Sequence, residues 1–324
     1  MQKVEELQFD TALGCQQTSD PGQVLRRVSS GVLTVLLSTL LAACGPAINQ
    51  TPPPPFEDYA SWHTIDFSEG LLHYASAGQP GNPLVIFVHG TPGSWSAFRE
   101  YLQNQELAQR THMIALDRPG FGKSAPLGTT PEFKDQAAAV ARLMRLNQSD
   151  RKAIVVGHSL GGSISYRVAI DYPDLVGGVL AISSAIDPEL SNPRWYNYAA
   201  GLPLVRWLLP DDLTTSNQEM MPLTDQLDAM LAKLAQVTMP VTVIQGANDG
   251  LVNHKNADFA EQTLINADLK VSRYADRGHF IVWEEHEAMV EEILHLVAKA
   301  EPLQLDVVRQ KELTKTTISY RSEL

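Results

Sequence analysis

From residue 60 onward, short apolar runs alternate with longer segments in which apolar residues recur at helical spacing. The clearest run is residues 83–89 (PLVIFVH), and such an unbroken run is typical of a strand covered on both faces of a sheet. A turn at Glu69-Gly70 predicts a strand pair around it. Seven further strands are thus predicted, at residues 64–67, 71–77, 113–116, 153–156, 179–182, 241–244 and 270–274.

Two segments between these strands have the pattern of amphipathic helices. Thr130-Pro131 predicts a helix start with a cap and a first-turn proline, and the apolar positions that follow are Phe133, Ala137, Val140 and Met144. A second helix is predicted from Leu223, Leu227, Met230 and Leu234. Alternating strands and helices predict an α/β fold, a mostly parallel eight-stranded sheet with helices on both faces. Residues 186–222, rich in Pro, Trp and Tyr, fit poorly as a simple loop.

The segment before the predicted fold looks like a secretion signal. Residues 31–43 (GVLTVLLSTLLAA) are apolar and follow Arg26 and Arg27, as in a signal peptide. The small residues before Cys44 resemble the lipobox of bacterial lipoproteins, which implies a signal cut before Cys44 and a lipid anchor on it. That resemblance implies an envelope location, with the periplasmic face of the outer membrane favoured because Gly45, not aspartate, follows the cysteine. A buried helix or an ordinary signal peptide is the alternative.

The predicted organisation has four parts. Residues 1–43 form the signal region, of which 1–23 are an annotation artefact if translation starts near Val24. Residues 44–59, with four consecutive prolines, form an extended tether. The predicted folded domain covers residues 60–299, and the polar residues 300–324 form a C-terminal tail.

Composition narrows the function classes. The 324 residues carry a formal charge of −12, which argues against a nucleic-acid partner because phosphate binding favours a basic face. Two cysteines are too few for a disulfide scaffold or a cysteine-built metal site. His254, His286 and His295 lie on predicted helices without partners at ligand spacing, so no metal site and no cofactor are expected.

The chemistry gathers at strand ends, first at Ser159. The segment GHSLGG at residues 157–162 is a G-x-S-x-G motif that follows a strand and precedes a helix. The glycines permit a sharp turn that exposes the Ser159 hydroxyl, and the amides at the start of the helix face developing negative charge. Ser159 is therefore the predicted nucleophile.

A serine nucleophile needs a base that is oriented by an acid. Asp249 lies in the loop after residues 241–244, and His279 lies in the loop after residues 270–274. The chain order Ser, Asp, His is the order expected for this kind of fold, so Asp249 is the predicted acid and His279 the predicted base. Asp187, just after residues 179–182, is the rival acid.

An oxyanion hole needs two backbone donors. The amide of Leu160, after the nucleophile, is one, and the loop 89–94 (HGTPGS) supplies the other, with Thr91 favoured because Pro92 has no amide. His89 is interpreted as a residue that orders this loop rather than as a base. An ion pair of Arg118 is expected to brace the neighbouring turn.

Five motifs in order resemble the α/β-hydrolase superfamily: HGTPGS, DRPGFGKS (117–124), GHSLGG, GANDGLV (246–252) and GHF (278–280). The resemblance covers about residues 64–299 and implies the triad Ser159, Asp249 and His279, with a small helical cap at 186–222. Haloalkane dehalogenases and soluble epoxide hydrolases share the first two segments but have an aspartate nucleophile. Ser159 therefore puts both of those activities in doubt.

The predicted function is an envelope-tethered serine hydrolase that cleaves small or medium apolar carboxylic esters through an acyl-enzyme. Trp195, Tyr198 and Trp207 of the cap either line the acyl pocket or form the cap's own core. Asn217 and Glu219 are expected to face the cleft. Two alternatives stay open: the same triad acting on amide, lactone or carbon–carbon bonds, and a non-catalytic ligand-binding lipoprotein on a hydrolase scaffold.

Overall fold

The structure is a computed structural model that describes residues 58–303. The chain divides into two units, Met1–Pro54 and Pro55–Leu324, and every described residue belongs to the second. The predicted signal region, Cys44 and nearly all of the predicted tether lie outside the described residues, as do residues 304–324 of the predicted tail.

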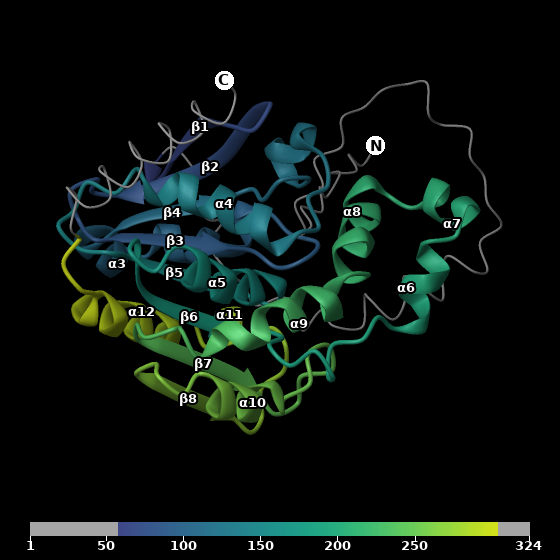
Figure 1. The fold of residues 1–324 in the computed structure, drawn as a ribbon. Coiled ribbons are helices and arrows are strands. Elements are labelled where there is room, and N and C mark those ends of the chain that lie inside the picture. The colour runs from purple at the N-terminus through teal and green to yellow at the C-terminus, as the bar shows by residue number, and fades with distance from the viewer. Residues whose placement is uncertain (1–57, 304–324) are drawn as a thin grey trace, which may run out of the picture. The chain divides into compact units, whose positions relative to one another are not determined.

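An eight-stranded sheet forms the centre of the described unit, in the order β1-β2-β4-β3-β5-β6-β7-β8 (Figure 1). The strands from β4 to β8 in this order run parallel, whereas β1 and β2 are antiparallel additions at one edge. All eight predicted strands are present, so the predicted fold class is confirmed. Their bounds are β1 Ser61–Phe67, β2 Gly70–Gly78, β3 Leu84–Val88, β4 His112–Leu116, β5 Ala153–His158, β6 Val176–Ile182, β7 Val241–Gly246 and β8 Leu269–Tyr274.

Two apolar clusters lie on opposite faces of the sheet, because alternate residues of each strand point to opposite sides. In β3, Ile86 belongs to one cluster and Phe87 to the other. Helices α4 (Phe133–Met144), α5 (Leu160–Asp171), α9 (Leu223–Leu234) and α10 (Asn256–Thr263) supply the first cluster. The second cluster is completed by η2 (Trp95–Phe98), α2 (Arg99–Gln103), α3 (Gln105–Arg110), α11 (Ile281–Glu284) and α12 (His286–Lys299).

The predicted helix faces are buried, but one predicted helix start is wrong. Helix α4 begins at Phe133, after its N-cap Glu132, and not at Thr130-Pro131. The Phe133 amide donates to Gln226 Oε1 at 3.0 Å, so a side chain of α9 satisfies an amide that the predicted cap was expected to satisfy. Thr130 and Pro131 lie in the irregular segment between η3 (Gly122–Leu127) and α4.

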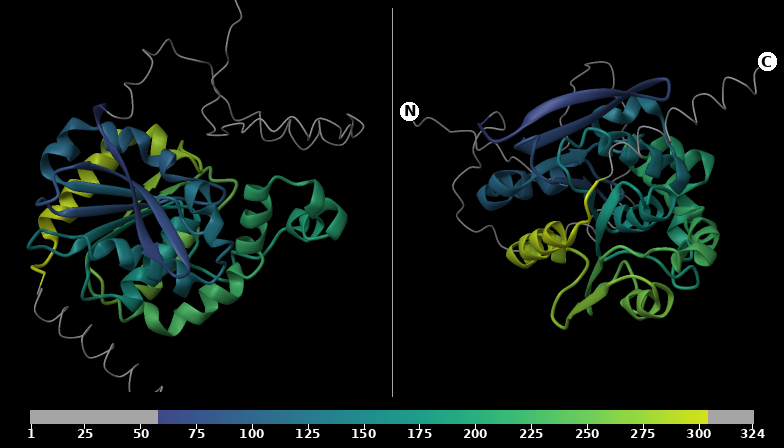
Figure 2. Two further views of the ribbon diagram at one scale, coloured as in Figure 1. Left: turned by 90° about the horizontal axis from the view of Figure 1, so that it is seen from above. Right: turned by 60° about the vertical axis from the view of Figure 1, so that its left-hand side comes forward.

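The insertion between β6 and β7 folds as helices α6 (Trp195–Ala200), α7 (Pro203–Leu208) and α8 (Asp211–Met220), followed by α9. Helices α6 to α8 lie within the predicted cap range and stand away from the sheet beside the ends of its strands (Figure 2). None of the helices among residues 58–303 combines the length and apolar character needed to cross a membrane.

Candidate active site

Ser159 occupies the turn between β5 and α5, at the N-cap of that helix. Its φ of 54° and ψ of −126° lie in a region that non-glycine residues rarely adopt, so the surrounding structure enforces the turn. Leu160 is the first residue of α5, and amides of the first helical turn have no partner within their helix. The Leu160 amide therefore lies beside Ser159 in the position expected of an oxyanion donor.

The two flanking glycines allow three backbones to meet at this turn. A Cβ on Gly157 would lie 2.3 Å from the Gly161 carbonyl oxygen, and a Cβ on Gly161 would lie 2.0 Å from the carbonyl oxygen of Val88. Any side chain at either position would push β5, α5 and β3 apart. This close packing explains why the motif requires both glycines.

Asp249 and His279 meet through a hydrogen bond of 2.9 Å between His279 Nδ1 and Asp249 Oδ2. The carboxylate also accepts from Gln245 Nε2 at 3.1 Å and from the amides of Leu251 and Val252 at 2.8 Å each. Burial by itself would raise the pKa of Asp249, but the hydrogen bonds from His279 and from these amides outweigh burial and lower that pKa. An ionised carboxylate only accepts, so Nδ1 of His279 donates the hydrogen of this bond.

His158 connects this pair to the nucleophile turn. Its Nε2 donates to the carbonyl oxygen of His279 at 2.9 Å, and the two imidazole rings are 4.9 Å apart. Because Ser159 is the next residue, the loop that carries His279 is fixed beside Ser159. Burial, followed by the charge of His279, lowers the pKa of His158 to about 3, so its ring is neutral at physiological pH.

The rival acid Asp187 has a different set of partners. Its Oδ1 accepts from the amide of Glu189 at 2.9 Å, and its own amide donates to Asn256 Oδ1 at 2.9 Å. These bonds order the chain as it leaves β6. The structure thus brings His279 into contact with Asp249, and Asp187 serves as a turn residue.

The loop after β3 lies against Ser159. A Cβ on Gly90 would be 3.5 Å from Ser159 Oγ, and Thr91 is the next residue of this loop. His89 Nδ1 donates to the Gly90 carbonyl oxygen at 2.7 Å, while Nε2 accepts from the Arg118 amide at 3.0 Å. Burial and, after it, the charge of Arg118 lower the pKa of His89 to about 3. With both ring nitrogens occupied, His89 orders the loop, as the sequence predicts.

Arg118 ties this loop to the cap. Its guanidinium donates to the carbonyl oxygens of His89 at 2.9 Å and Gly90 at 2.8 Å. The same group pairs with both carboxylate oxygens of Glu219 on α8, at 2.5 and 3.0 Å, and both side chains are fully buried. The predicted ion pair of Arg118 is confirmed, and its partner comes from the cap.

Glu219 does not face a cleft, contrary to the prediction, whereas Asn217 lines the cavity described below. Glu219 is 1% exposed because it pairs with Arg118 and also accepts from Gln136 Nε2 at 2.8 Å. Asn217 exchanges hydrogen bonds with Asn197 of α6, at 3.0 and 3.1 Å. One residue therefore joins the cap to the core, and the other joins two cap helices.

A second histidine–aspartate pair was not predicted from the sequence. His73 Nδ1 lies 2.8 Å from Asp117 Oδ2, and Asp117 also accepts from the amides of Trp95 at 2.9 Å and Lys123 at 3.0 Å. His73 lies on β2 and Asp117 follows β4, two strands that pair antiparallel. Only the register of that pairing brings the two residues together, and neither lies in a motif that indicates it.

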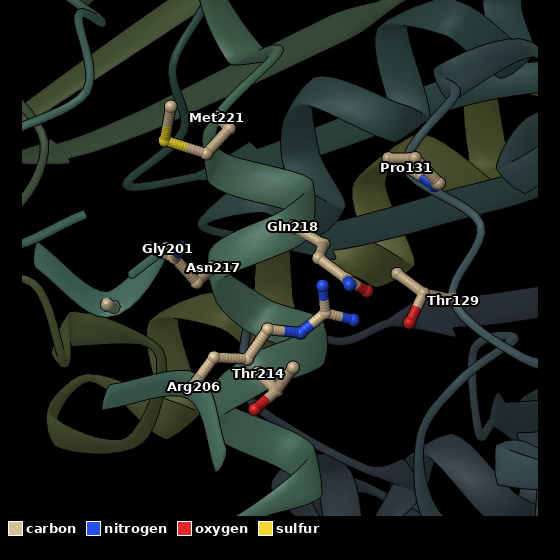
Figure 3. Close-up of a pocket in the computed structure, with 9 residues that line it drawn as sticks. Thr129, Pro131, Gly201, Arg206, Thr214, Asn217, Gln218 and Met221 are labelled. Carbon is tan, nitrogen blue, oxygen red and sulfur yellow. The ribbon is translucent and has the colours of Figure 1, made fainter. Parts of the chain in front are cut away.

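A cavity of about 430 Å³ lies between the cap and the segment before α4 (Figure 3). The guanidinium of Arg206 extends from α7 toward Gln218 of α8 in this cavity, with the Thr129 side chain nearby (Figure 3). The lining residues are Thr129, Pro131, Ala200, Gly201, Arg206, Thr214, Asn217, Gln218 and Met221, so none of the predicted catalytic residues is among them.

The cap aromatics do not form a core of the cap. Trp195 is 75% exposed, Tyr198 58% and Trp207 59%, and none of them lines the cavity. The other interpretation, that they contact substrate, stays a prediction. Within residues 58–303, no cluster of three or more His, Cys, Asp or Glu side chains has an arrangement that would hold a metal ion.

Residues 83–207 match the family described as alpha/beta hydrolase fold. The chain is 24% identical over 290 residues to a Saccharomyces cerevisiae protein named uncharacterized hydrolase YNR064C, which covers 74% of this chain and 98% of that protein. It is 35% identical over 111 residues to epoxide hydrolase 3 of Mus musculus, a match that covers 34% of this chain. The chain spans only 30% of the length of that enzyme.

Among solved structures, a bacterial membrane phospholipase A superposes with a TM-score of 0.57 at 20% identity, covering 83% of this chain and 95% of that one. This likeness shows the fold alone. Together with the sheet topology and the match over residues 83–207, it shows that the described unit has the α/β-hydrolase fold.

Proposed function

We propose that this chain is a serine hydrolase that cleaves small or medium apolar carboxylic esters. The supporting observation is the arrangement around Ser159: an enforced turn beside His279, whose Nδ1 is held by Asp249 at 2.9 Å. The yeast and mouse relatives are also named as hydrolases. The restriction to small or medium acyl groups follows from the short cap, which predicts a small pocket.

The proposed reaction uses an acyl-enzyme. Ser159 Oγ attacks the ester carbonyl carbon while His279 Nε2 takes the hydroxyl proton, and the amides of Leu160 and Thr91 stabilise the negative oxygen. The intermediate then expels the alcohol, which receives the proton from His279. A water molecule attacks the acyl group by the same route and releases the carboxylic acid. Asp249 keeps the His279 ring oriented and stabilises its charged form.

Epoxide opening is an alternative because the chain resembles epoxide hydrolase 3 over 111 residues. We disfavour it because Ser159 stands where the resemblance to soluble epoxide hydrolases implies an aspartate. Amides, lactones and carbon–carbon bonds are further alternatives that the same triad serves.

A substrate panel tests this proposal. Esters of increasing acyl length, an amide, a lactone and an epoxide are offered to the full chain and to Ser159→Ala. Ester turnover that Ser159→Ala reduces by at least about a thousandfold is the expected result. Turnover of the epoxide alone, or ester turnover unchanged in Ser159→Ala, would contradict the proposal.

We further propose that the enzyme is anchored to the bacterial envelope through a lipid on Cys44, on the periplasmic face of the outer membrane. The support is the sequence alone: two arginines, an apolar run and small residues before Cys44. Labelled palmitate is expected to enter the wild-type protein and not Cys44→Ser. Equal labelling of both proteins would contradict the anchor.

A further inference from the structure

Helices α6 and α7 present an unusual surface, which we call the cap tip (residues 195–208). Seven of the fifteen exposed large apolar residues among residues 58–303 lie on it. They are Trp195, Tyr196, Tyr198, Leu202, Leu204, Trp207 and Leu208. None of the six residues of α7 is buried, so this helix contributes almost nothing to the packing of the described unit. Such a concentration of exposed apolar side chains marks a binding surface.

The chemistry of the cap tip fits a lipid interface. Tryptophan and tyrosine are the residues that gather at the boundary between lipid head groups and acyl chains, since their rings are apolar and their edges form hydrogen bonds. The leucines add apolar surface between them, as in helices that lie in the plane of a membrane. Trp195, Leu204 and Trp207 are each at least 59% exposed, and the tip stands away from the sheet (Figure 1).

Charge favours a phospholipid surface over a second copy of the chain. Residues 190–210 contain two arginines and no carboxylate, although the whole chain has a formal charge of −12. A self-complementary contact between two tips would bring Arg206 of one copy toward Arg206 of the other. Lipid phosphates, in contrast, attract Arg206. Arg194, just before the tip, donates to the carbonyl oxygens of Gly250 and Leu251 at 3.0 Å each.

Arg206 has the position that such a contact needs. Arg206 is exposed on α7, next to the exposed Trp207, and it also lines the cavity. Its side chain forms no ion pair within residues 58–303. Gln218 and Thr129 lie near its guanidinium (Figure 3). A phosphate oxygen that approached the tip would therefore find a cation that is already solvent-accessible and polar groups around it.

We propose that the cap tip docks on a phospholipid bilayer and inserts shallowly among the head groups, with Arg206 contacting lipid phosphate. This proposal goes beyond the proposed hydrolase activity and does not rest on it, because docking is measured without turnover. It also does not rest on lipidation of Cys44, because the test removes that cysteine.

The test uses two proteins that carry the same environment-sensitive fluorophore. In one protein the fluorophore is on the cap tip, and in the other it is far from the tip. Both proteins are full-length chains with Cys15→Ser and Cys44→Ser, labelled at Leu204→Cys or at Ile265→Cys. Leu204 is 70% exposed and Ile265 67%, but Ile265 lies between α10 and β8, away from the cap. Residues 31–43 are common to both proteins, so the difference between the two labels reports on the tip.

With vesicles of phosphatidylcholine and phosphatidylglycerol, the emission of the Leu204 label is expected to shift to shorter wavelength and that of the Ile265 label to stay unchanged. Arg206→Gln is expected to weaken vesicle binding about fivefold, the effect of about one cation near an anionic surface. Inorganic phosphate should not shift the Leu204 label.

Several outcomes would overturn docking on lipid. They are no shift at Leu204, equal shifts at both labels, or unchanged binding of Arg206→Gln. Emission of the Leu204 label that is already at shorter wavelength than that of the Ile265 label without vesicles would assign the tip another occupant. That occupant is a second copy of the chain if the difference grows with protein concentration. It is the chain's own cleft if the difference does not depend on concentration.

Discussion

The described unit contains two buried histidine–aspartate pairs that look alike locally. His279 and Asp249 are 2.9 Å apart, and His73 and Asp117 are 2.8 Å apart. In both pairs the carboxylate also accepts from two backbone amides, and in both these bonds lower the pKa of the aspartate although burial opposes this. In both pairs, therefore, Nδ1 of the histidine donates to a carboxylate.

The surroundings of the two imidazoles differ. His279 follows β8 and is held beside the Ser159 turn by His158. His73 lies on β2, where its Nε2 is buried and has no hydrogen-bond partner among residues 58–303, and the Trp62 ring is 4.9 Å from its own. We therefore expect the His279 pair, which lies beside the Ser159 turn, to activate a nucleophile, and the His73 pair to stabilise the fold.

The largest expected effect separates the two histidines. His279→Ala is expected to lower kcat/KM for an ester by at least about a thousandfold, because the base is lost. His73→Ala is expected to leave kcat/KM within about tenfold and to lower the free energy of unfolding by about 1–3 kcal/mol, because Asp117 loses one donor. Ester kinetics and urea unfolding of both variants measure this. Equal losses of activity would erase the distinction.

The aspartates provide the second contrast. Asp249→Asn is expected to lower kcat by about a thousandfold or more, because an amide in place of the carboxylate favours the wrong tautomer of His279. Asp117→Asn keeps the shape of its site, so we expect a loss of stability with kcat reduced by less than about tenfold. Steady-state kinetics at saturating ester distinguish the two variants. An unchanged kcat in Asp249→Asn would contradict the assignment of Asp249 as the acid.

The third prediction concerns Arg118, which follows Asp117 and contacts the loop beside Ser159. Glu219→Gln leaves the buried Arg118 charge without a counter-ion and is expected to lower the free energy of unfolding by about 3 kcal/mol. Because Arg118 also positions His89 and Gly90, we expect kcat to fall about tenfold with KM changing less. Glu189→Gln, an exposed glutamate of the insertion, is the matched control and should be neutral.

The loss of stability in acid tests the two buried histidines whose rings form hydrogen bonds with backbone groups and not with a carboxylate. His89 and His158 have a pKa lowered to about 3, against an ordinary value of 6.5. The unfolded chain therefore takes up protons first, and the stability present above pH 6.5 is lost as the pH falls toward 3. As the pH falls from 7 to 5, each histidine is expected to lower the free energy of unfolding by about 2 kcal/mol. Urea unfolding of wild type and His89→Asn should show a shallower pH dependence in the variant.

The smallest expected effect belongs to the rival acid. Asp187→Asn is expected to change kcat/KM by less than about twofold, because Asp187 caps a turn and His279 pairs with Asp249. The same ester assay that is used for Asp249→Asn measures it. If Asp187→Asn were the more damaging of the two, the assignment of the acid would be reversed.

The sequence predicted what depends on local pattern. Eight strands follow from apolar runs, and the Ser159 turn follows from glycines whose spacing only a strand–turn–helix needs. The placement of Asp249 and His279 at one edge of the sheet could also be predicted, because both follow strands of one parallel sheet.

Contacts between residues that are far apart in the sequence could not be predicted from the sequence. His73 meets Asp117 only because β2 pairs with β4, and Glu219 meets Arg118 only because α8 folds back onto the core. The start of α4 was misplaced because a side chain from α9 satisfies the Phe133 amide. The exposure of Trp195 and Trp207 depends on how α6 and α7 pack against the rest of the unit, and composition does not determine that packing.

Covalent labelling tests the central claim, that Ser159 is a nucleophile activated by His279 and not by the other pair. The full chain is treated with a fluorophosphonate, and the modified peptide is identified by mass spectrometry. We predict one adduct on Ser159, formed at an undiminished rate in His73→Ala and at least about a hundredfold more slowly in His279→Ala. No adduct under conditions that label a generic serine esterase, or an adduct elsewhere, would contradict the account.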